Sequence, residues 1–369
     1  MPKAKETILE IDLKALKHNY GHLKSKLNPG TKFLAVVKAF AYGNDAKAIA
    51  KYLQELNVDY FAVAYAKEGA VLRRAGITKP ILVLHTLTAN FNVILKNCLE
   101  PNLYNAKLLE AFIAFATKQK QTNYPIHLKF NTGLNRLGFN EANLAYLANT
   151  LQATNAVKVK SLFSHLAASE DLNESEFTKK QIERFTTISN SLTESLGFKP
   201  LLHMCNTSGI LNYPEAHFDM VRSGIGLYGF GNSAKESKHL IPIALLKTII
   251  SQIHQIEKNE SVGYNRAYKA NGIEKTATLP LGHADGINRI YGKGKGFVTI
   301  NGKKAPIVGN VCMDMIMVNI TDIDCKEGDE VIVFDAKTIS AESLAEAAGT
   351  ISYELITSIS QRVKRVILK

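Results

Sequence analysis

The sequence predicts an α/β fold: an N-terminal (β/α)8 barrel of the TIM type, followed by a C-terminal, mainly antiparallel β-domain. Between about residues 30 and 230, apolar runs typical of strands alternate with helical patterns. These units number close to eight, which favours a closed barrel over an open doubly wound sheet. From about residue 240 onward, strand-like runs are joined by short turns rich in Gly, Asp and Asn.

The expected barrel strands are continuous apolar runs, the pattern of parallel strands that are buried on both faces. They lie at 33–37, 60–64, 80–84, 126–130, 159–163, 201–204 and, more weakly, 219–221. Helical patterns lie between them, for example at 46–53 and 177–196. Strands separated by helices pair in parallel through right-handed crossovers.

The second half should form the β-domain. Strand-like runs occur at 248–253 and 330–334, and the run at 298–303 contains Asn-Gly, a strong hairpin signal. A helical stretch at 340–360 closes this part. We expect the barrel within residues 1–238 and the β-domain within 239–369, with the first residues able to pair with the β-domain.

Bulk properties narrow the classes of function. The formal charge of +12 suits an anionic partner, but the lysines are scattered and form no nucleic-acid-binding module. No apolar run approaches the ~20 residues that cross a bilayer, and the charged N-terminus does not resemble a secretory signal, so a cytoplasmic location is expected.

The four cysteines are far apart, without the spacing of a zinc or redox motif, so no metal is predicted. We expect reduced, separate thiols at Cys98, Cys205 and Cys325.

Polar residues follow almost every expected barrel strand. In such barrels the chemistry lies where the strands end, so these residues should share one rim. They are Lys38, Tyr65, His85, Asn131, Arg136, Ser164, His165, the turn 206–209 and the turn 222–226.

Lys38 directly follows a buried-strand pattern. Desolvation there would lower the pKa of its amine and expose a nucleophile suited to a carbonyl cofactor. By position alone, a lysine that keeps its amine in solvent is the commoner explanation. His165 fits a core histidine and a residue beside a cofactor ring equally well.

Two small-residue turns, 206–209 and 223–226, could present backbone N–H groups to a phosphate. Each is weak evidence alone, but their place at the last two units matches the usual phosphate site of such barrels. Arg136 and Arg222 could each bind an anion bidentately or form a structural ion pair.

Taken together and in chain order, these motifs resemble the alanine racemase family, the fold-type III enzymes that use pyridoxal 5'-phosphate (PLP). The similarity covers nearly the whole chain. The motifs lie at 36–43, 129–138, 164–165, 203–209, 221–229, 262–264, 280–286, 309–314 and 353–354.

The resemblance implies a PLP-dependent racemase that interconverts L-alanine and D-alanine and supplies D-alanine for peptidoglycan. Lys38 would carry PLP covalently, and Lys38 and Tyr264 would be acid/base groups on opposite faces of the substrate. In the family the tyrosine comes from the partner subunit, so the resemblance implies a homodimer with shared active sites.

The resemblance also implies binding roles. Arg136 and the backbone at Met313 would hold the substrate carboxylate beside Tyr264. Lys129 occupies a position that is carbamylated in some relatives, and His283 and Asp285 would lie at the entryway. The cofactor would be held by Lys38, Tyr42, His165, Asn206, Thr207, Arg222, Gly224, Ile225 and Tyr353.

Several residues depart from the family pattern. Phe40 stands where most relatives have Asn, Asn131 replaces Asp, and His283 replaces Tyr. Asn310 and Met315 replace a common Arg and Gln. None of these positions is a catalytic base, so they affect the expected substrate breadth and rate more than the reaction type.

Other functions stay open. A broad-specificity or serine racemase would use the same bases with a different pocket. A non-catalytic PLP-binding protein would resemble the barrel half alone, and the β-domain with Tyr264 argues against it. PLP decarboxylases usually lack an arginine at the ring nitrogen, where Arg222 is expected.

Overall fold

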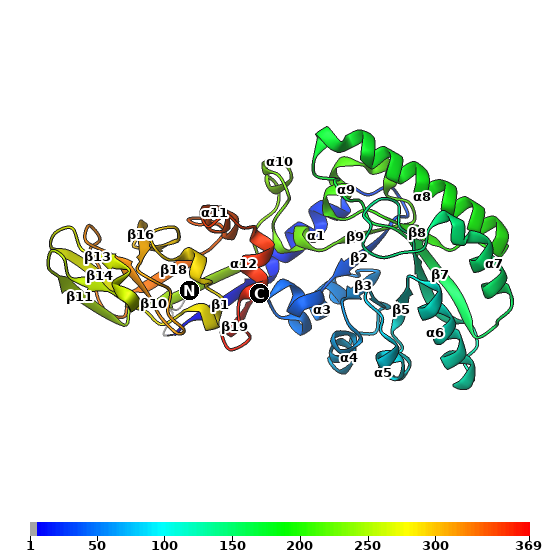
Figure 1. The fold of residues 1–369 in the computed structure, drawn as a ribbon, viewed down its shortest axis with the longest axis horizontal. Coiled ribbons are helices and arrows are strands. Elements are labelled where there is room, and N and C mark those ends of the chain that lie inside the picture. The colour runs from blue at the N-terminus through cyan, green and yellow to red at the C-terminus, as the bar shows by residue number, and fades with distance from the viewer. Residues whose placement is uncertain (1–5) are drawn as a thin grey trace.

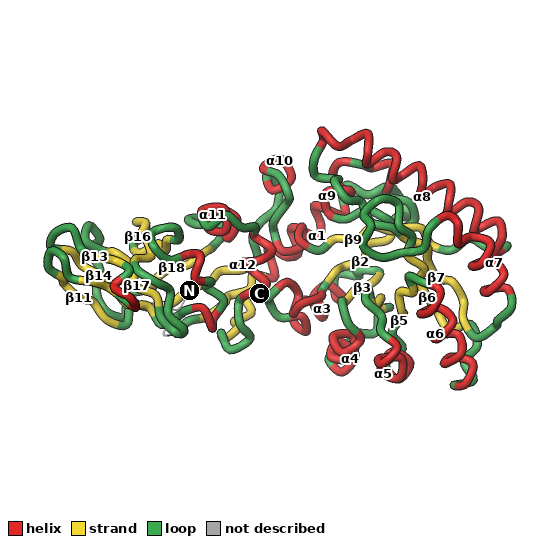
Figure 2. The backbone as a smooth tube through the Cα atoms, viewed as in Figure 1, coloured by secondary structure: helices red, strands yellow, loops and turns green. Residues whose placement is uncertain are grey.

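The computed structural model describes residues 6–369 as two lobes arranged along one long axis (Figure 1). One lobe is a ring of strands covered by helices, and the other is dominated by strands (Figure 2). In the described residues, no helix combines the length and apolar character needed to span a bilayer.

The barrel consists of eight parallel strands in the order β8-β7-β6-β5-β4-β3-β2-β9. Backbone bonds from Asp219 to Leu202 and from Arg222 to Cys205 bring β9 against β8, so the barrel is nearly closed. The predicted fold class is therefore confirmed. The strands are β2 (Lys32–Val36), β3 (Tyr60–Val63), β4 (Ile81–Val83), β5 (Glu100–Leu103), β6 (Tyr124–Lys129), β7 (Val157–Phe163), β8 (Leu201–His203) and β9 (Met220–Ser223).

Helices cover the outside of the barrel (Figure 1). The predicted helices at 46–53 and 177–196 correspond to α3 and α8. Asp45 caps the N-terminus of α3, since its side chain accepts hydrogen bonds from two first-turn N–H groups. The helices of this lobe are α1 (Leu13–Lys24), α2 (Lys38–Tyr42), α3 (Ala46–Glu55), α4 (Ala66–Arg74), α5 (Phe91–Lys96), α6 (Ala106–Lys118), α7 (Leu144–Gln152), α8 (Ser175–Leu196), α9 (Thr207–Asn212) and α10 (Ala234–Ser237).

One barrel strand, β5, was absent from the predicted set. Its sequence is Glu-Pro-Asn-Leu, and Pro101 and two polar residues interrupt the apolar pattern that marks the other strands. All four residues are nevertheless buried. The Glu100 carboxylate can be buried because Tyr60 and His127 donate hydrogen bonds to it, which local sequence does not reveal.

The second lobe is a nine-stranded sheet in the order β11-β14-β17-β16-β15-β18-β10-β1-β19. All its pairs are antiparallel except β1 with β19, and β1 brings the N-terminal residues into this sheet. The strands are β1 (Ile8–Asp12), β10 (Ala244–Ile249), β11 (Gln252–Ile256), β14 (Glu274–Leu279), β15 (Phe297–Ile300), β16 (Lys303–Val308), β17 (Ile316–Asn319), β18 (Glu330–Phe334) and β19 (Lys364–Leu368), with β12 (Ser261–Val262) and β13 (Tyr268–Lys269) forming a separate pair.

The Asn-Gly hairpin is confirmed between β15 and β16, where Asn301 and Gly302 have φ values of 47° and 79°. Two other predictions were wrong because each predicted element is two elements in the structure. The single strand expected at 248–253 is divided between β10 and β11. The single helical stretch at 340–360 is divided into α11 (Ala341–Ala347) and α12 (Ser352–Ser358), because the chain turns at Gly349 with φ of 75°.

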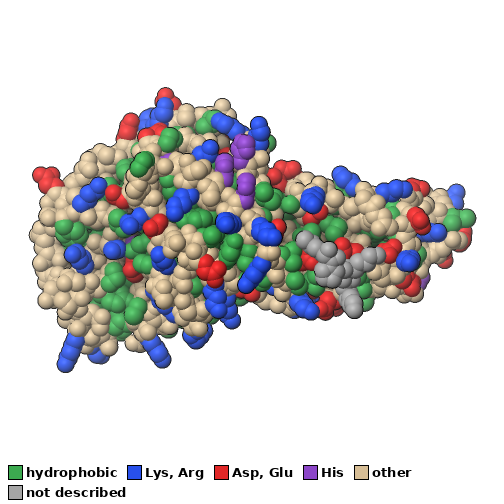
Figure 3. Space-filling model, turned by 180° about the vertical axis from the view of Figure 1, so that it is seen from behind, with side chains coloured by type: hydrophobic (Ala, Val, Ile, Leu, Met, Phe, Trp, Pro, Cys, Tyr) green, Lys and Arg blue, Asp and Glu red, His purple; other side chains and the backbone are tan. Residues whose placement is uncertain are grey.

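The surface agrees with the scattered charge in the sequence. On the face in Figure 3, Lys and Arg side chains are spread over both lobes among carboxylates and do not gather into one patch.

Candidate active site

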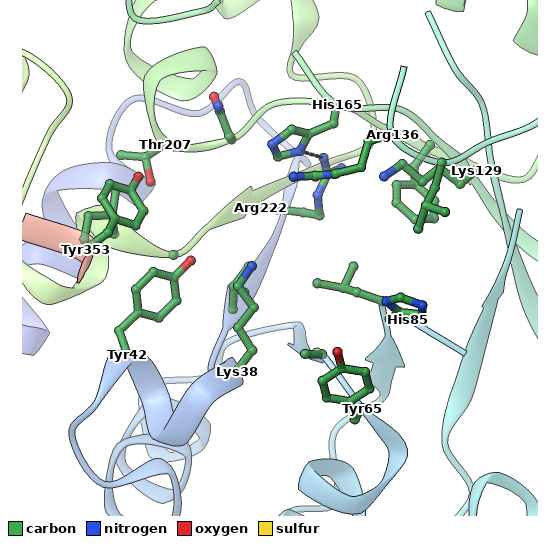
Figure 4. A pocket seen from close by; sticks show the side chains of 18 of the residues that line it. Lys38, Tyr42, Tyr65, His85, Lys129, Arg136, His165, Thr207, Arg222 and Tyr353 are labelled. Carbon is green, nitrogen blue, oxygen red and sulfur yellow. Dashed lines mark hydrogen bonds between the residues drawn. The ribbon is translucent and has the colours of Figure 1, made fainter. Parts of the chain in front are cut away.

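A cavity of about 620 Å³ opens at the carboxyl ends of the barrel strands. Figure 4 shows that side chains from separate strands converge on it, with Tyr353 contributed by α12 of the second lobe. The predicted site residues that line it are Lys38, Tyr42, Lys129, Arg136, His165, Asn206, Thr207, Arg222, Gly224, Ile225 and Tyr353.

Lys38 starts an unusual left-handed turn. Ala39, Phe40, Ala41 and Tyr42 all have φ values between 51° and 56°, a conformation that is strained for residues with a Cβ. Glu68 supports the turn by accepting a 2.7 Å bond from the Ala39 N–H. This turn directs both Lys38 and Tyr42 toward the cavity (Figure 4).

Burial lowers the pKa of the Lys38 amine, and the positive charge of Arg136 lowers it further, whereas Glu68 opposes the shift. A lowered pKa increases the fraction of neutral amine, which is the nucleophilic and proton-accepting form. The geometry therefore favours a reactive Lys38 over a lysine that keeps its amine in solvent.

Arg222 is held rigidly in the floor of the cavity. Its Nη1 donates to His203 Nδ1 at 2.6 Å, and its Nη2 lies 2.8 Å from the Ser164 carbonyl and 3.1 Å from His165 Nδ1. Burial lowers the Arg222 pKa to about 10, so the group stays a cation near neutral pH. Among the described residues no hydrogen-bond partner is found for its Nε–H, so this donor is free for a ligand.

One end of the cavity has the features of an anion cradle. The backbone at Gly224 lies directly under the Tyr42 hydroxyl, where an added Cβ would stand 2.1 Å from Tyr42 Oη. Thr207 Oγ1 lies 3.0 Å from Ser223 Oγ and accepts a bond from the Gly226 N–H. Burial raises the pKa of Tyr42, so its hydroxyl remains a neutral donor.

This cradle yields a direct prediction. Gly224→Ala should lower the affinity for PLP, the cofactor that the sequence resemblance implies, by at least about tenfold, because the methyl group must displace the Tyr42 hydroxyl from the cradle. The measurement is a titration of cofactor-free protein with PLP by absorbance. Gly21→Ala is the matched control, since a Cβ there meets nothing within 4 Å. Unchanged affinity in Gly224→Ala would remove Gly224 from the proposed phosphate site.

Two further basic residues, Lys129 and Arg136, lie on the opposite side of the cavity from Tyr42 and Tyr353 (Figure 4). Burial lowers the Lys129 pKa to about 7, with smaller contributions from Arg136, Arg222 and Lys38. Such an excess of positive charge suits a ligand that carries both a phosphate and a carboxylate.

Tyr264 and Met313 do not line this cavity. They lie together at a separate surface depression of the second lobe, where 72% of Tyr264 and 60% of Met313 is exposed. Within one described chain, the two proposed acid/base residues, Lys38 and Tyr264, thus belong to different depressions.

The predicted entryway residues lie beside this second depression. His283 donates its backbone N–H to the Cys312 carbonyl, which anchors the turn His283–Asp285 to the Met313 segment. Asp285 is buried and accepts bonds of 2.7 and 3.0 Å from Arg362, so its main contact is an ion pair.

Sequence reasoning missed some residues that shape the cavity. Asn232 lines it and accepts a 3.2 Å bond from the Tyr353 hydroxyl, and Phe163 forms part of the wall. Neither residue belongs to a polar pattern at a strand end, so no local signal marked them.

Comparisons with known proteins indicate one family for both halves of the chain. The family model described as "Alanine racemase, N-terminal domain" matches residues 11–231, and the model described as "Alanine racemase, C-terminal domain" matches residues 243–367. The alanine racemase of Thermodesulfovibrio yellowstonii is 36% identical over 363 residues, which cover 96% of this chain and 96% of that protein.

Two solved structures extend the likeness. Alanine racemase from Clostridium difficile 630 has a TM-score of 0.93 and 34% identity, covering 100% of this chain and 97% of that chain. Alanine racemase from Bartonella henselae, described with covalently bound pyridoxal phosphate, has a TM-score of 0.90 and 29% identity, and the match covers 99% of this chain and 100% of that chain.

Proposed function

Because this chain belongs to the alanine racemase family, we propose that it interconverts L-alanine and D-alanine by a two-base mechanism with PLP held at Lys38. The single observation that carries the proposal is the cavity itself. It places a lysine of lowered pKa between an anion cradle and two arginines, Arg136 and Arg222.

The residues present fit PLP. At the cradle, only a glycine lets the backbone of residue 224 approach the Tyr42 hydroxyl so closely, and hydroxyl groups of Tyr42, Thr207 and Tyr353 line the same end of the cavity, as a phosphate requires. The free Nε–H of Arg222 is a donor suited to a ring nitrogen. PLP, when bound, supplies an electron sink that acidifies the α-proton of an amino acid.

Each residue of the proposed site would then have a separate role in the reaction. Arg136 would orient the substrate carboxylate, and the Lys38 amine would take or return the α-proton on one face. The Tyr264 hydroxyl would do the same on the opposite face. Arg222, which remains charged and can only donate, would keep the ring nitrogen unprotonated and so limit side reactions.

We further propose that the enzyme acts as a homodimer in which Tyr264 and Met313 complete the partner's cavity. The support is that these side chains are exposed in one chain, together with the neighbouring Met315, which is 50% exposed. Exposed apolar side chains grouped around a catalytic candidate are typical of a surface that another subunit covers.

Racemisation of single L-amino acids tests the proposal. Purified holoenzyme should invert L-alanine fastest, as followed by circular dichroism or coupled D-amino-acid oxidation. Comparable rates for L-serine or larger amino acids would favour the broad-specificity alternative, to which His283 at the expected entryway could contribute. Bound PLP without inversion of any amino acid would favour a non-catalytic PLP-binding protein.

Lys129 should be carbamylated above neutral pH. A neutral amine attacks CO₂ and releases one proton, and a pKa of about 7 means that the neutral fraction grows steeply between pH 6 and 8. A carbamate would also replace repulsion of Arg136 with attraction. ¹³C NMR of protein in labelled bicarbonate should show the carbamate signal at pH 8, and Lys129→Ala should lack it. An unmodified amine under these conditions would contradict the prediction.

The place of the enzyme in the cell stays a prediction. We propose a cytoplasmic enzyme whose D-alanine enters peptidoglycan. A strain without it, and without any other alanine racemase, should need external D-alanine to grow. Normal growth without D-alanine would contradict the biosynthetic role.

A further inference from the structure

A line of buried side chains runs through the barrel from Arg222 to Glu100, and the proposed reaction does not use its far end. Each of five strands, β5 to β9, contributes one residue to it: Glu100, His127, Ser161, His203 and Arg222. None of the five is more than 8% exposed.

The line is connected by short hydrogen bonds. Arg222 Nη1 lies 2.6 Å from His203 Nδ1, and His203 Nε2 lies 2.9 Å from Ser161 Oγ. Ser161 Oγ lies 2.6 Å from His127 Nδ1, and His127 Nε2 lies 2.7 Å from a Glu100 carboxylate oxygen. The Phe163 ring stacks on the His203 ring, with centroids 4.8 Å apart and an angle of 2° between the planes.

With a neutral His127 ring, the chemistry of the two ends fixes the direction of every bond. A guanidinium can only donate, so His203 Nδ1 must accept and His203 must carry its proton on Nε2. That proton is donated to Ser161, whose hydroxyl then donates to His127 Nδ1. His127 must therefore carry its proton on Nε2 and donate it to Glu100, which as a carboxylate can only accept.

The charges at the two ends support the same arrangement. Burial and the positive charge of Arg222 hold the His203 pKa well below its usual range, so this ring is neutral. Hydrogen bonds from His127 and Tyr60 overcome the effect of burial and keep the Glu100 pKa below its usual value. In this arrangement the line joins a cation to an anion through two neutral rings, and each hydrogen bond in such an aligned chain polarises and strengthens the next.

We propose that Glu100 is a positioning residue for the racemase reaction, which acts through His127, Ser161 and His203 to hold the Arg222 guanidinium in orientation toward the cofactor ring. This rests on the proposed contact between Arg222 and PLP. The line fixes one edge of the guanidinium, while the Ser164 carbonyl and His165 fix another, so the free Nε–H points in one direction.

The first test measures the protonation of the two histidine rings directly. ¹⁵N NMR of histidine side chains in the holoenzyme, assigned with single histidine variants, should show His127 and His203 as neutral rings protonated on Nε2. A proton on Nδ1 of either ring would reverse the line and overturn the proposal.

The second test removes the anion. Glu100→Gln keeps the shape of the side chain and an acceptor oxygen, but removes the charge. It should lower kcat by about 10- to 100-fold and shift the absorbance band of bound PLP, with KM for alanine within about twofold of the parent value. Ser161→Ala removes one hydroxyl and so interrupts the line. It should change kcat and the absorbance band in the same direction, and it is the test variant if Glu100→Gln does not fold.

Tyr60→Phe is the matched control. It removes one of the two donors to the same Glu100 oxygen, but His127 still donates to this carboxylate and the line to Arg222 stays intact. Its kcat and absorbance should stay near the parent values. A loss of thermal stability in Glu100→Gln, with the parent kcat and band, would show a purely structural role and overturn the proposal.

Arg222→Gln separates this proposal from the proposed function. A shifted PLP band in Arg222→Gln, but the parent band in Glu100→Gln, would overturn the role of Glu100 alone. The parent band in both variants would overturn the contact between Arg222 and PLP as well.

Discussion

Lys38→Ala should lose racemisation by more than about 1,000-fold and lose the visible absorbance of lysine-bound PLP. The lysine would supply both the covalent attachment and the acid/base group on one face, so no neighbouring residue replaces it. Lys129 also lines the cavity, but its amine lies over the Phe163 ring, 5.8 Å from the ring centroid. We therefore do not expect Lys129 to replace Lys38.

The measurements are an absorbance spectrum, borohydride reduction followed by mass spectrometry of peptides, and the rate of L-alanine inversion. Reduction of the parent enzyme should fix PLP to the peptide that contains Lys38. Lys47→Ala, at an exposed position on α3, is the matched control and should behave like the parent. Parent-like absorbance in Lys38→Ala would contradict the proposed cofactor site.

Tyr264→Phe should keep bound PLP and its absorbance, but lose inversion by about 100- to 10,000-fold. The substitution removes only a hydroxyl from an exposed side chain, so folding and cofactor binding should not change. Tyr146→Phe is the control, because it also removes a tyrosine hydroxyl but lies on α7, where the hydroxyl donates to the Glu110 carboxylate. Its rate of inversion should match that of the parent. Inversion at the parent rate would remove Tyr264 from the mechanism.

The same variant tests whether active sites are shared between chains. If Tyr264 serves the partner's cavity, a dimer of one Lys38→Ala chain and one Tyr264→Phe chain has one complete site. Unfolding and refolding an equal mixture should then restore about one quarter of the parent activity, since half the dimers are mixed and each has one working site of two. No restoration would mean that each site is built from a single chain.

Local sequence patterns were sufficient to predict most barrel strands and the cavity residues that follow them. Lys38, His165 and Arg222 could be expected at one rim because a parallel barrel brings every strand's carboxyl end to the same side. The same logic failed for β5, because Pro101 and Glu100 look like loop residues until their burial and partners are known. It also failed at 340–360, where a turn at Gly349 divides a continuous helical pattern.

By itself the sequence determined the class of fold, the order of the motifs and the residue types available for chemistry, because strand and helix periodicity and strand-end turns are local properties. Only the tertiary structure decided that Glu100 is joined to Arg222 across five strands, and that Tyr264 lies away from Lys38 within one chain. Hydrogen bonds between side chains depend on ångström-scale approach of residues far apart in the chain. Register, twist and packing set that approach, and no local pattern encodes it.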